Sequence, residues 1–206
     1  MLKPFYTSGL FEAGCDEAGR GCLAGPVVAA AVLFSPEIEK AEWFGILNDS
    51  KQLTEKKREF LREKIMQDAV AYGIAEASPG EIDEINILNA SILAMHRALE
   101  KLEKCLYGRN LQHIIVDGNK FRPYKEIPFD TVVKGDAKFA SIAAASVLAK
   151  TERDHIMKTL DAEFPQYNWG KNKAYPTKDH RLAIEKHGVT PYHRMSFRLL
   201  PDPTLF

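Results

Sequence analysis

The chain has few cysteines, no long apolar run and no excess of either charge. Its three cysteines form no C-x-x-C pair, so we expect neither disulfides nor structural zinc. No apolar run approaches the ~18 residues that span a bilayer, and the N-terminus lacks a signal-peptide core. These absences predict a soluble cytoplasmic protein that has no membrane partner.

Several common catalytic patterns are also missing. No Gly-Lys-Ser/Thr follows Gly19-Arg20-Gly21, so there is no Walker loop, and neither G-x-S-x-G nor H-E-x-x-H occurs. No base can be identified for a cysteine nucleophile. The histidines that lack metal-ligand spacing are predicted to be surface or structural groups: His180, His187 and His193.

The composition suits one ordinary domain. With 206 residues, 45% of them hydrophobic, the chain can build its own core. The net charge is zero, yet residues 165–206 hold seven Lys/Arg against three Asp/Glu. We therefore predict an acidic catalytic core over residues 1–164. A basic, helical and irregular extension over 165–206 would pack on it and guide a polyphosphate backbone. A monomer is the default expectation.

Hydrophobic patterns predict strands alternating with helices, and hence an α/β fold. Strands are expected before Asp16 and at 27–34, 70–76, 113–117 and 131–133. The first two should pair as a hairpin. Helices are expected from Thr54, from Ser78 to about residue 102, from Phe139 to about His155, and from Thr177 to Gly188. The helix after Phe139 is rich in small residues and should pack closely on the sheet.

Acidic residues follow two of these strands directly. Asp16 and Glu17 end one apolar segment, and Asp117 ends another. In α/β sheets ligands collect at the carboxyl ends of the strands, so these acids converge if the two strands are neighbours. Asp136 lies just before the small-residue helix and could complete the set. Such hard oxygen ligands suit Mg²⁺ or Mn²⁺, and two ions ~4 Å apart would support phosphodiester hydrolysis.

A glycine-rich turn follows the first acids. Gly19 and Gly21 let backbone N–H groups approach a bulky anion, and Arg20 can add charge-assisted hydrogen bonds. Taken alone, acids beside a glycine are more often a solvated turn than a metal site. The repeated acid at Asp117 makes the metal site the better interpretation.

Three further residues are candidate substrate ligands. Ser50 and Lys51 precede a helix, where they could hold a phosphate; a plain helix-entry turn explains them equally well. Tyr175 lies among lysines and could stack on a sugar or base. Asp154 is predicted to form an ion pair with Arg153 or Lys150 instead of binding a metal.

With these motifs in this order, the chain resembles bacterial ribonuclease HII over nearly its whole length. The segments that carry the resemblance are Asp16-Glu17-Ala18-Gly19-Arg20-Gly21, Leu23-Ala24-Gly25-Pro26-Val27, Asp49-Ser50-Lys51, Val116-Asp117-Gly118-Asn119, Lys134-Gly135-Asp136, 142–154, Tyr175-Pro176-Thr177 and His193-Arg194-Met195-Ser196-Phe197. Ribonuclease HIII is a poorer match, because its glycine loop differs.

The resemblance implies a ribonuclease H-like mixed sheet flanked by helices, with a C-terminal helical extension. It implies cleavage of RNA in RNA/DNA hybrids and incision 5′ of single ribonucleotides in DNA, leaving 3′-hydroxyl and 5′-phosphate ends. Asp16, Glu17, Asp117 and Asp136 would then be catalytic metal ligands. Gly19, Arg20 and Gly21 would contact the ribose 2′-hydroxyl, and Tyr175 would stack on that sugar. Members commonly carry His and Gly where Asn172 and Ala174 stand here.

Two alternatives remain at this point. One is a related metal-dependent DNA nuclease or resolvase, against which Tyr175 and the Gly-Arg-Gly turn argue. The other is a catalytically silent nucleic-acid-binding module whose acids only cap turns.

Overall fold

The computed structural model describes residues 2–200. The strands are β1 (Glu12–Ala18), β2 (Val27–Leu33), β3 (Ala71–Ala77), β4 (His113–Asp117) and β5 (Phe129–Val132). The α-helices are α1 (Glu55–Asp68), α2 (Pro79–Lys104), α3 (Ala140–Glu163), α4 (Trp169–Asn172) and α5 (Lys178–His187). Short 3₁₀ turns are η1 (Ile38–Lys40), η2 (Phe44–Ile46), η3 (Ser50–Gln52), η4 (Gly135–Ala137) and η5 (Pro165–Tyr167).

The five strands form one mixed sheet in the order β3-β2-β1-β4-β5. β1 pairs antiparallel with β2, as the sequence predicts, and β2 pairs antiparallel with β3. β1 pairs parallel with β4, and β4 with β5. Cys15 lies opposite Val116 in the β1–β4 register, so the acids that follow them reach the same edge of the sheet.

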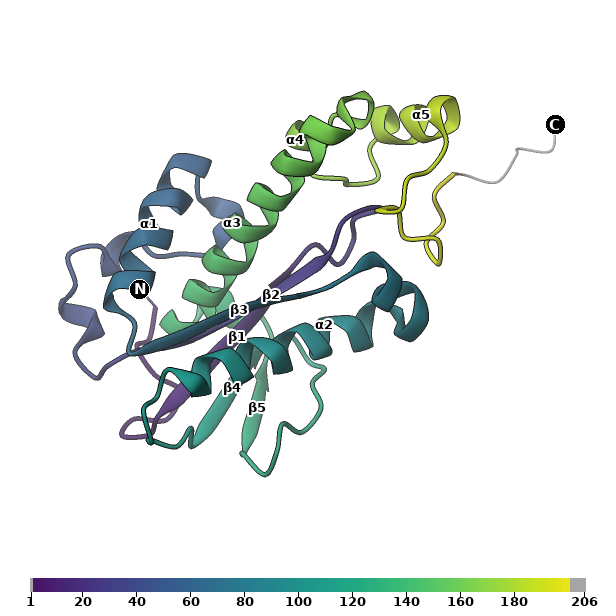
Figure 1. The fold of residues 1–206 in the computed structure, drawn as a ribbon. Helices are drawn as coiled ribbons and strands as arrows, with labels where there is room; N and C mark the ends of the chain where they lie inside the picture. Colours follow the sequence, from purple (N-terminus) through teal and green to yellow (C-terminus); the bar gives the residue numbers. More distant parts are fainter. Residues whose placement is uncertain (1, 201–206) are drawn as a thin grey trace.

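Helices cover both faces of this sheet, which confirms the predicted α/β class (Figure 1). Strand residues alternate between the faces. One face, with Ala13 and Cys15 of β1, forms a core with α2. The other, with Ala30 and Val32 of β2, packs on α1 and α3. In Figure 1, α2 lies on one side of the strands and α1 and α3 lie on the other.

Two glycines let the helices approach the sheet closely. A Cβ on Gly14 of β1 would collide with Ser141 and Ile142 at the start of α3. A Cβ on Gly73 of β3 would collide with the Ala98 carbonyl oxygen of α2. The alanines in the first half of α3 are fully buried, so the predicted close packing of this helix is confirmed.

The predicted helix starts are also confirmed. The Thr54 hydroxyl caps α1, Thr177 caps α5, and Ser78 forms a reciprocal capping box with Glu81 at the start of α2. Capping satisfies backbone N–H groups that lack partners within the helix. α2 is nevertheless interrupted at Asn86, whose φ of 65° and ψ of 163° are not helical. The side chain of Asn86 accepts from Leu88 N and Asn89 N and so starts the second half of the helix.

Other boundaries differ from the prediction. α3 continues to Glu163, beyond the expected end near His155, because Met157 and Leu160 pack in a further core. β5 ends at Val132 and starts at Phe129. The expected irregular tail falls partly on residues 201–206, which lie outside the described residues.

Residues beyond α3 pack on the end of that helix around a third apolar cluster. Trp169 and Tyr167 stack with ring centroids 4.9 Å apart, next to His180 and His193. His180 is held by the Trp169 indole N–H at 2.9 Å. His180 and His193 are buried and His187 is exposed, so the expectation of structural or surface histidines is confirmed. Across residues 2–200, none of the helices has the length and apolar character needed to cross a membrane.

Candidate functional site

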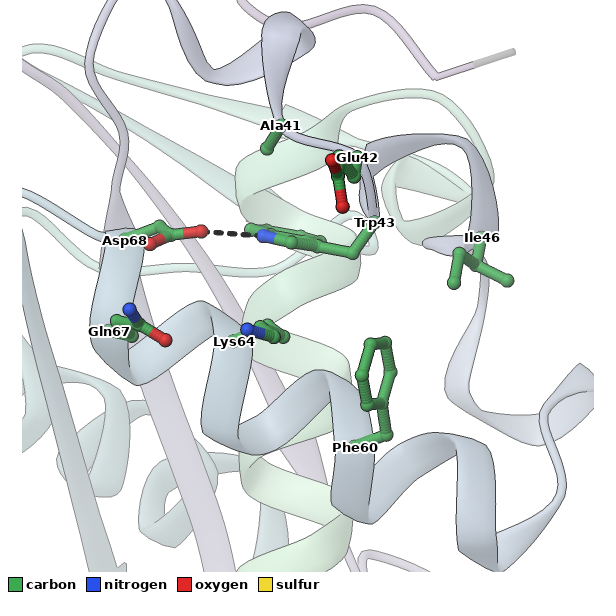
Figure 2. A pocket seen from close by; sticks show the side chains of 8 residues that line it. All are labelled: Ala41, Glu42, Trp43, Ile46, Phe60, Lys64, Gln67 and Asp68. Carbon is green, nitrogen blue, oxygen red and sulfur yellow. Dashed lines mark hydrogen bonds between the residues drawn. The ribbon is translucent and has the colours of Figure 1, made fainter.

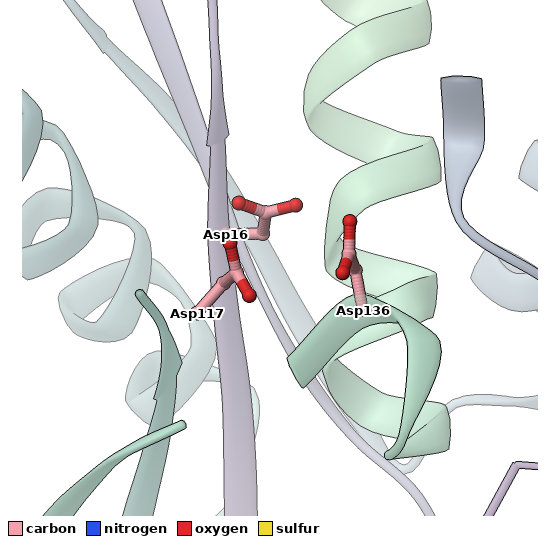
Figure 3. A group of neighbouring side chains, drawn as sticks. All are labelled: Asp16, Asp117 and Asp136. Atoms are coloured by element: carbon pink, nitrogen blue, oxygen red, sulfur yellow. The ribbon is translucent and has the colours of Figure 1, made fainter. Parts of the chain in front are cut away.

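Three aspartates converge at the edge of the sheet where β1 and β4 end. Asp16 extends from β1, Asp117 ends β4, and Asp136 lies in η4, just before α3 (Figure 3). One carboxylate oxygen from each lies within 4.8 Å of the others. The sequence predicted this convergence, and its condition, that the two strands are neighbours, is met by the parallel β1–β4 pair.

The electrostatics of this cluster match a divalent-cation site. Burial, with repulsion from Glu17 and Asp117, raises the pKa of Asp16 well above its ordinary value. Burial, with repulsion from Asp117 and Asp49, also raises the pKa of Asp136. Uncompensated carboxylates at this spacing repel each other, whereas a cation would stabilise all three. The donor set, made of oxygen atoms alone, therefore fits Mg²⁺ or Mn²⁺.

Glu17 lies beside this cluster but is not one of the three converging groups. Consecutive strand residues point to opposite faces of a sheet, so its side chain diverges from that of Asp16. Its Oε1 accepts a hydrogen bond from Arg20 Nη1 at 3.0 Å. Burial raises the pKa of Glu17, and Arg20 opposes that rise. Glu17 nevertheless lines the same cleft as Asp16 and Asp117.

That cleft, of ≈ 220 Å³, brings together nearly all the predicted site residues. Its walls are Asp16, Glu17, Ala18, Gly19, Arg20, Gly21, Ser50, Lys51, Asp117, Ser146, Lys150 and Tyr175. Gly19 has a φ of +98°, which favours glycine. A Cβ on Gly21 would meet no atom within 4 Å. The backbone at Gly21 is thus open to a bound molecule.

Ser50 and Lys51 take different positions in the cleft. Ser50 is buried, and its hydroxyl hydrogen-bonds with the Ser146 hydroxyl at 2.8 Å. Ser146 in turn hydrogen-bonds to Asp16. Lys51 is exposed, with Nζ 3.9 Å from Asp136 Oδ2. Partial burial opposes its charge, but the surrounding carboxylates outweigh that effect and raise its pKa. Lys51 is therefore the better candidate for a phosphate ligand.

Tyr175 reaches the cleft from a tightly held loop. Asn172 donates to Tyr167 O at 2.7 Å and accepts from Ala174 N at 2.8 Å. Ala174 has a φ of +61°, in the left-handed region that favours glycine. The loop thus keeps a left-handed residue at this position, with Asn172 bridging across it.

Sequence reasoning missed Lys150 and Ser146 as cleft residues. They stand four apart on α3, so they share the face that meets the acids; that spacing was the available signal. Asp154, one turn further, accepts from Lys150 Nζ at 2.6 Å, as predicted. Its second partner is Arg58 Nη2 at 3.1 Å, not Arg153. Arg153 donates to backbone carbonyls instead.

A different cavity, of ≈ 420 Å³, contains none of the predicted site residues. It lies against α1 and is lined by Ala41, Glu42, Trp43, Ile46, Phe60, Lys64, Gln67 and Asp68 (Figure 2). The Trp43 indole N–H donates to Asp68 Oδ2 at 2.6 Å. Trp43 is thereby fixed as part of the packing between α1 and the preceding 3₁₀ turns.

Comparison with known proteins agrees with this geometry. The ribonuclease H2 structure from Pyrococcus horikoshii has a TM-score of 0.73 at 27% identity, covering 91% of this chain and 94% of that one. The fold and its acidic strand ends define a metal-dependent nuclease of the ribonuclease H-like class. The family model for ribonuclease HII matches residues 13–200. The chain belongs to the ribonuclease HII family.

Curated relatives support the same assignment. The ribonuclease HII of Christiangramia forsetii is 59% identical, with 96% of each chain covered. That of Bacteroides fragilis is 58% identical, covering 100% of this chain and 98% of the relative. The chain is accordingly a type HII ribonuclease H, an endonuclease that acts on RNA/DNA hybrids and depends on a divalent metal.

Proposed function

We propose that this enzyme incises DNA on the 5′ side of a single embedded ribonucleotide, leaving 3′-hydroxyl and 5′-phosphate ends, as well as cleaving longer hybrids. One observation carries the proposal. The acids Asp16 and Asp117 share a single ≈ 220 Å³ cleft with the 19–21 turn and Tyr175. Groups suited to hydrolysis thus lie beside groups suited to recognising one sugar.

Recognition of a ribonucleotide within DNA depends on its 2′-hydroxyl, the group that distinguishes it from its neighbours. Gly21 offers open backbone to a sugar, because no atom lies where its Cβ would be. Tyr175 is 44% exposed at the edge of the cleft, so its ring face is available for stacking. Arg20 is held by Glu17 at 3.0 Å and adds a cation next to the turn.

Asp16, Asp117 and Asp136 would hold two Mg²⁺ or Mn²⁺ ions, with Glu17 as a further ligand from the cleft wall. Bound ions of this kind activate water and stabilise the leaving oxygen in phosphodiester hydrolysis. Lys51 and Lys150 line the same cleft and would supply positive charge for the substrate's phosphates. The basic residues beyond position 164 would guide the duplex toward the cleft.

A labelled DNA duplex with one ribonucleotide tests this proposal, beside an all-DNA duplex and a long RNA/DNA hybrid. We expect a nick 5′ of the ribonucleotide in Mg²⁺ or Mn²⁺, none with chelator, and none in the all-DNA control. Cleavage of the hybrid without the single-ribonucleotide nick would refute the proposed selectivity. Equal cleavage of all-DNA duplex would instead favour a general nuclease.

The role of Tyr175 has its own test. Tyr175→Ala should reduce cleavage at single ribonucleotides more than cleavage of long hybrids, by about five- to 150-fold, since one stacking contact contributes ~1–3 kcal/mol. Tyr107→Ala is a matched control, because Tyr107 is 95% exposed and does not line the cleft. Equal losses on both substrates would contradict a role at the junction.

A further inference from the structure

Two arginines are buried close to the cleft but do not line it. The exposed fractions of Arg153 on α3 and Arg194 in the segment after α5 are 1% and 0%. Within residues 2–200, neither guanidinium forms an ion pair with a carboxylate. Buried charges are normally paired, because taking them out of water is costly. Two unpaired buried cations therefore need an explanation.

Within residues 2–200, the Arg153 guanidinium donates its hydrogen bonds to backbone carbonyls on two loops. Nε donates to Pro26 O at 3.1 Å and Nη2 to Ala24 O at 3.0 Å, both just before β2. Nη1 donates to Lys173 O at 3.0 Å, two residues before Tyr175. This one side chain thus joins the segment after the 19–21 turn to the loop that carries the tyrosine.

Arg153 also lies directly against the turn itself. A Cβ on Gly19 would collide with the Arg153 guanidinium, so the turn rests on that side chain. The glycine at position 19 is required both by this contact and by its positive φ. The position of Arg153 therefore sets the position of the turn.

Arg194 holds the same segment from the opposite end of the chain. Its Nε donates to Gly25 O at 3.0 Å, and its Nη1 donates to Arg20 O at 3.1 Å, inside the 19–21 turn. Its backbone N donates to Leu23 O at 2.9 Å. Nη2 is buried without a hydrogen-bond partner in the described part of the chain, and the guanidinium lies 5.2 Å from the Phe197 ring centre.

This arrangement is electrostatically unfavourable. Burial and the proximity of Arg153 lower the pKa of Arg194 to about 10. Apolar side chains of similar size would fill the space without placing like charges together. The two arginines instead donate five side-chain hydrogen bonds. These bonds fix carbonyl groups of the 19–21 turn, of residues 24–26 and of the tyrosine loop. Local departures from the most stable arrangement are expected at functional sites.

We propose that Arg153 and Arg194 are positioning residues for single-ribonucleotide recognition, which hold the 19–21 turn at a fixed distance from Tyr175. The inference rests on the proposed function, because it assumes that the turn and Tyr175 contact the same sugar. Neither arginine lines the cleft, so neither would touch the substrate. A single ribose at the junction must contact the 19–21 turn and Tyr175 at the same time. A long hybrid offers many further backbone contacts, so its binding depends less on this distance.

Arg153→Lys and Arg194→Lys test this in the full-length enzyme. Lysine keeps the charge, but it lacks the fork of donors that spans two or three carbonyls. We expect the ratio of single-ribonucleotide to long-hybrid cleavage to fall about ten- to a hundredfold, because a small misplacement of the groups that position a substrate can lower the rate by that much. The kcat on the long hybrid should stay near that of the wild type, and KM on the single-ribonucleotide duplex should rise. Assays are run well below the melting temperature of each variant.

Trp43→Phe is the matched control. It removes the hydrogen bond that the buried Trp43 indole N–H donates to Asp68 Oδ2 at 2.6 Å, which joins α1 to the 3₁₀ turns before it and involves neither the 19–21 turn nor the tyrosine loop. It should lower the melting temperature and leave the cleavage ratio unchanged. Equal losses on both substrates in the arginine variants would show a merely structural role and overturn the inference.

Asp83→Ala provides a second variant should the arginine variants fail to fold. Asp83 on α2 accepts from Met195 N at 2.8 Å and from Ser196 N at 2.9 Å, next to Arg194, and these bonds are exposed. Its loss should loosen the Arg194 segment and lower the same ratio about two- to fivefold. An unchanged ratio in a folded Asp83→Ala and in any folded arginine variant would overturn the inference.

Tyr175→Ala separates this inference from the proposed function. If Tyr175→Ala lowers the ratio and the folded arginine variants do not, positioning by the arginines is wrong and recognition by Tyr175 stands. If Tyr175→Ala leaves the ratio unchanged, the proposed recognition is wrong, and the inference that rests on it is overturned as well.

Discussion

Asp117→Asn should stabilise the metal-free enzyme while abolishing its activity. Carboxylate oxygens of Asp117, Asp16 and Asp136 lie within 4.8 Å of one another, a spacing at which two unit charges repel by about 3 kcal/mol at an effective dielectric constant of ~20. The variant removes two such repulsions. The amide can still accept the hydrogen bond from Gly135 N, which is 2.7 Å from Asp117 Oδ1. Part of the repulsion is already relieved in the wild type, because the raised pKa values of Asp16 and Asp136 favour the neutral forms of these carboxyl groups.

The net gain should therefore be about 1–3 kcal/mol in the free energy of unfolding at neutral pH. Urea unfolding with excess chelator measures it directly. A melting curve gives a second measure, at roughly 2–4 °C for each kcal/mol in a chain of this size. Adding Mg²⁺ should raise the melting temperature of the wild type and have little effect on the variant. Cleavage of the long hybrid should fall by about 10³-fold or more, because metal-dependent stabilisation of several kcal/mol is lost.

Asp179→Asn is the matched control. It makes the same chemical change in an exposed residue in the first turn of α5, outside the cluster, so its stability should change little and its activity should stay. The reasoning is refuted if Asp117→Asn is less stable than the wild type in chelator. It is also refuted if Mg²⁺ stabilises that variant as strongly as the wild type.

Three further predictions concern stability. Burial and nearby His180 lower the pKa of His193 to about 4. In the unfolded chain this histidine has a pKa near 6.5, so the unfolded state binds more protons than the folded state between these two values. The free energy of unfolding should therefore fall by about 2 kcal/mol from pH 6.5 to 5. Urea unfolding across that range measures this slope, which His193→Asn should largely remove. Ser78→Ala breaks the capping box with Glu81 and should cost about 1 kcal/mol, detected by melting, with no change in kcat. Gly14→Ala forces a Cβ into the start of α3 and should cost about 1–3 kcal/mol, with reduced activity because Asp16 is two residues away; unchanged stability would contradict the close packing of α3.

The central acids could be predicted from the sequence because strand ends carry positional information. A short apolar run that ends on an acid places that acid at one edge of the sheet, and Asp16 and Asp117 share this pattern. Asp136 could be predicted because it lies just before a helix rich in small residues, which let that helix pack closely on the sheet. Glu17 lies outside the group of three converging aspartates but lines the same cleft as Asp16 and Asp117, so its role as a metal ligand stays a prediction.

The supporting residues could not be predicted in the same way. Arg153 looked like one more charged residue on a helix, because its carbonyl partners come from loops whose positions only the tertiary fold determines. Arg58, the second partner of Asp154, lies on another helix for the same reason. The interruption of α2 at Asn86 was hidden by the helical spacing of the apolar residues that follow it. These features depend on contacts between distant segments, which single-sequence patterns do not encode.

The strand order also has a consequence for how the enzyme forms during synthesis. β1, β2, β3 and α2 all precede β4 in the chain and pack together, so they can assemble early. β4 must then pair with β1 across a separation of 101 residues, as the contact between Glu12 and His113 shows. Contacts that close such long loops form slowly. We therefore expect the carboxylates to stay apart in the nascent chain and the enzyme to be unable to cut nucleic acid until β4 has docked.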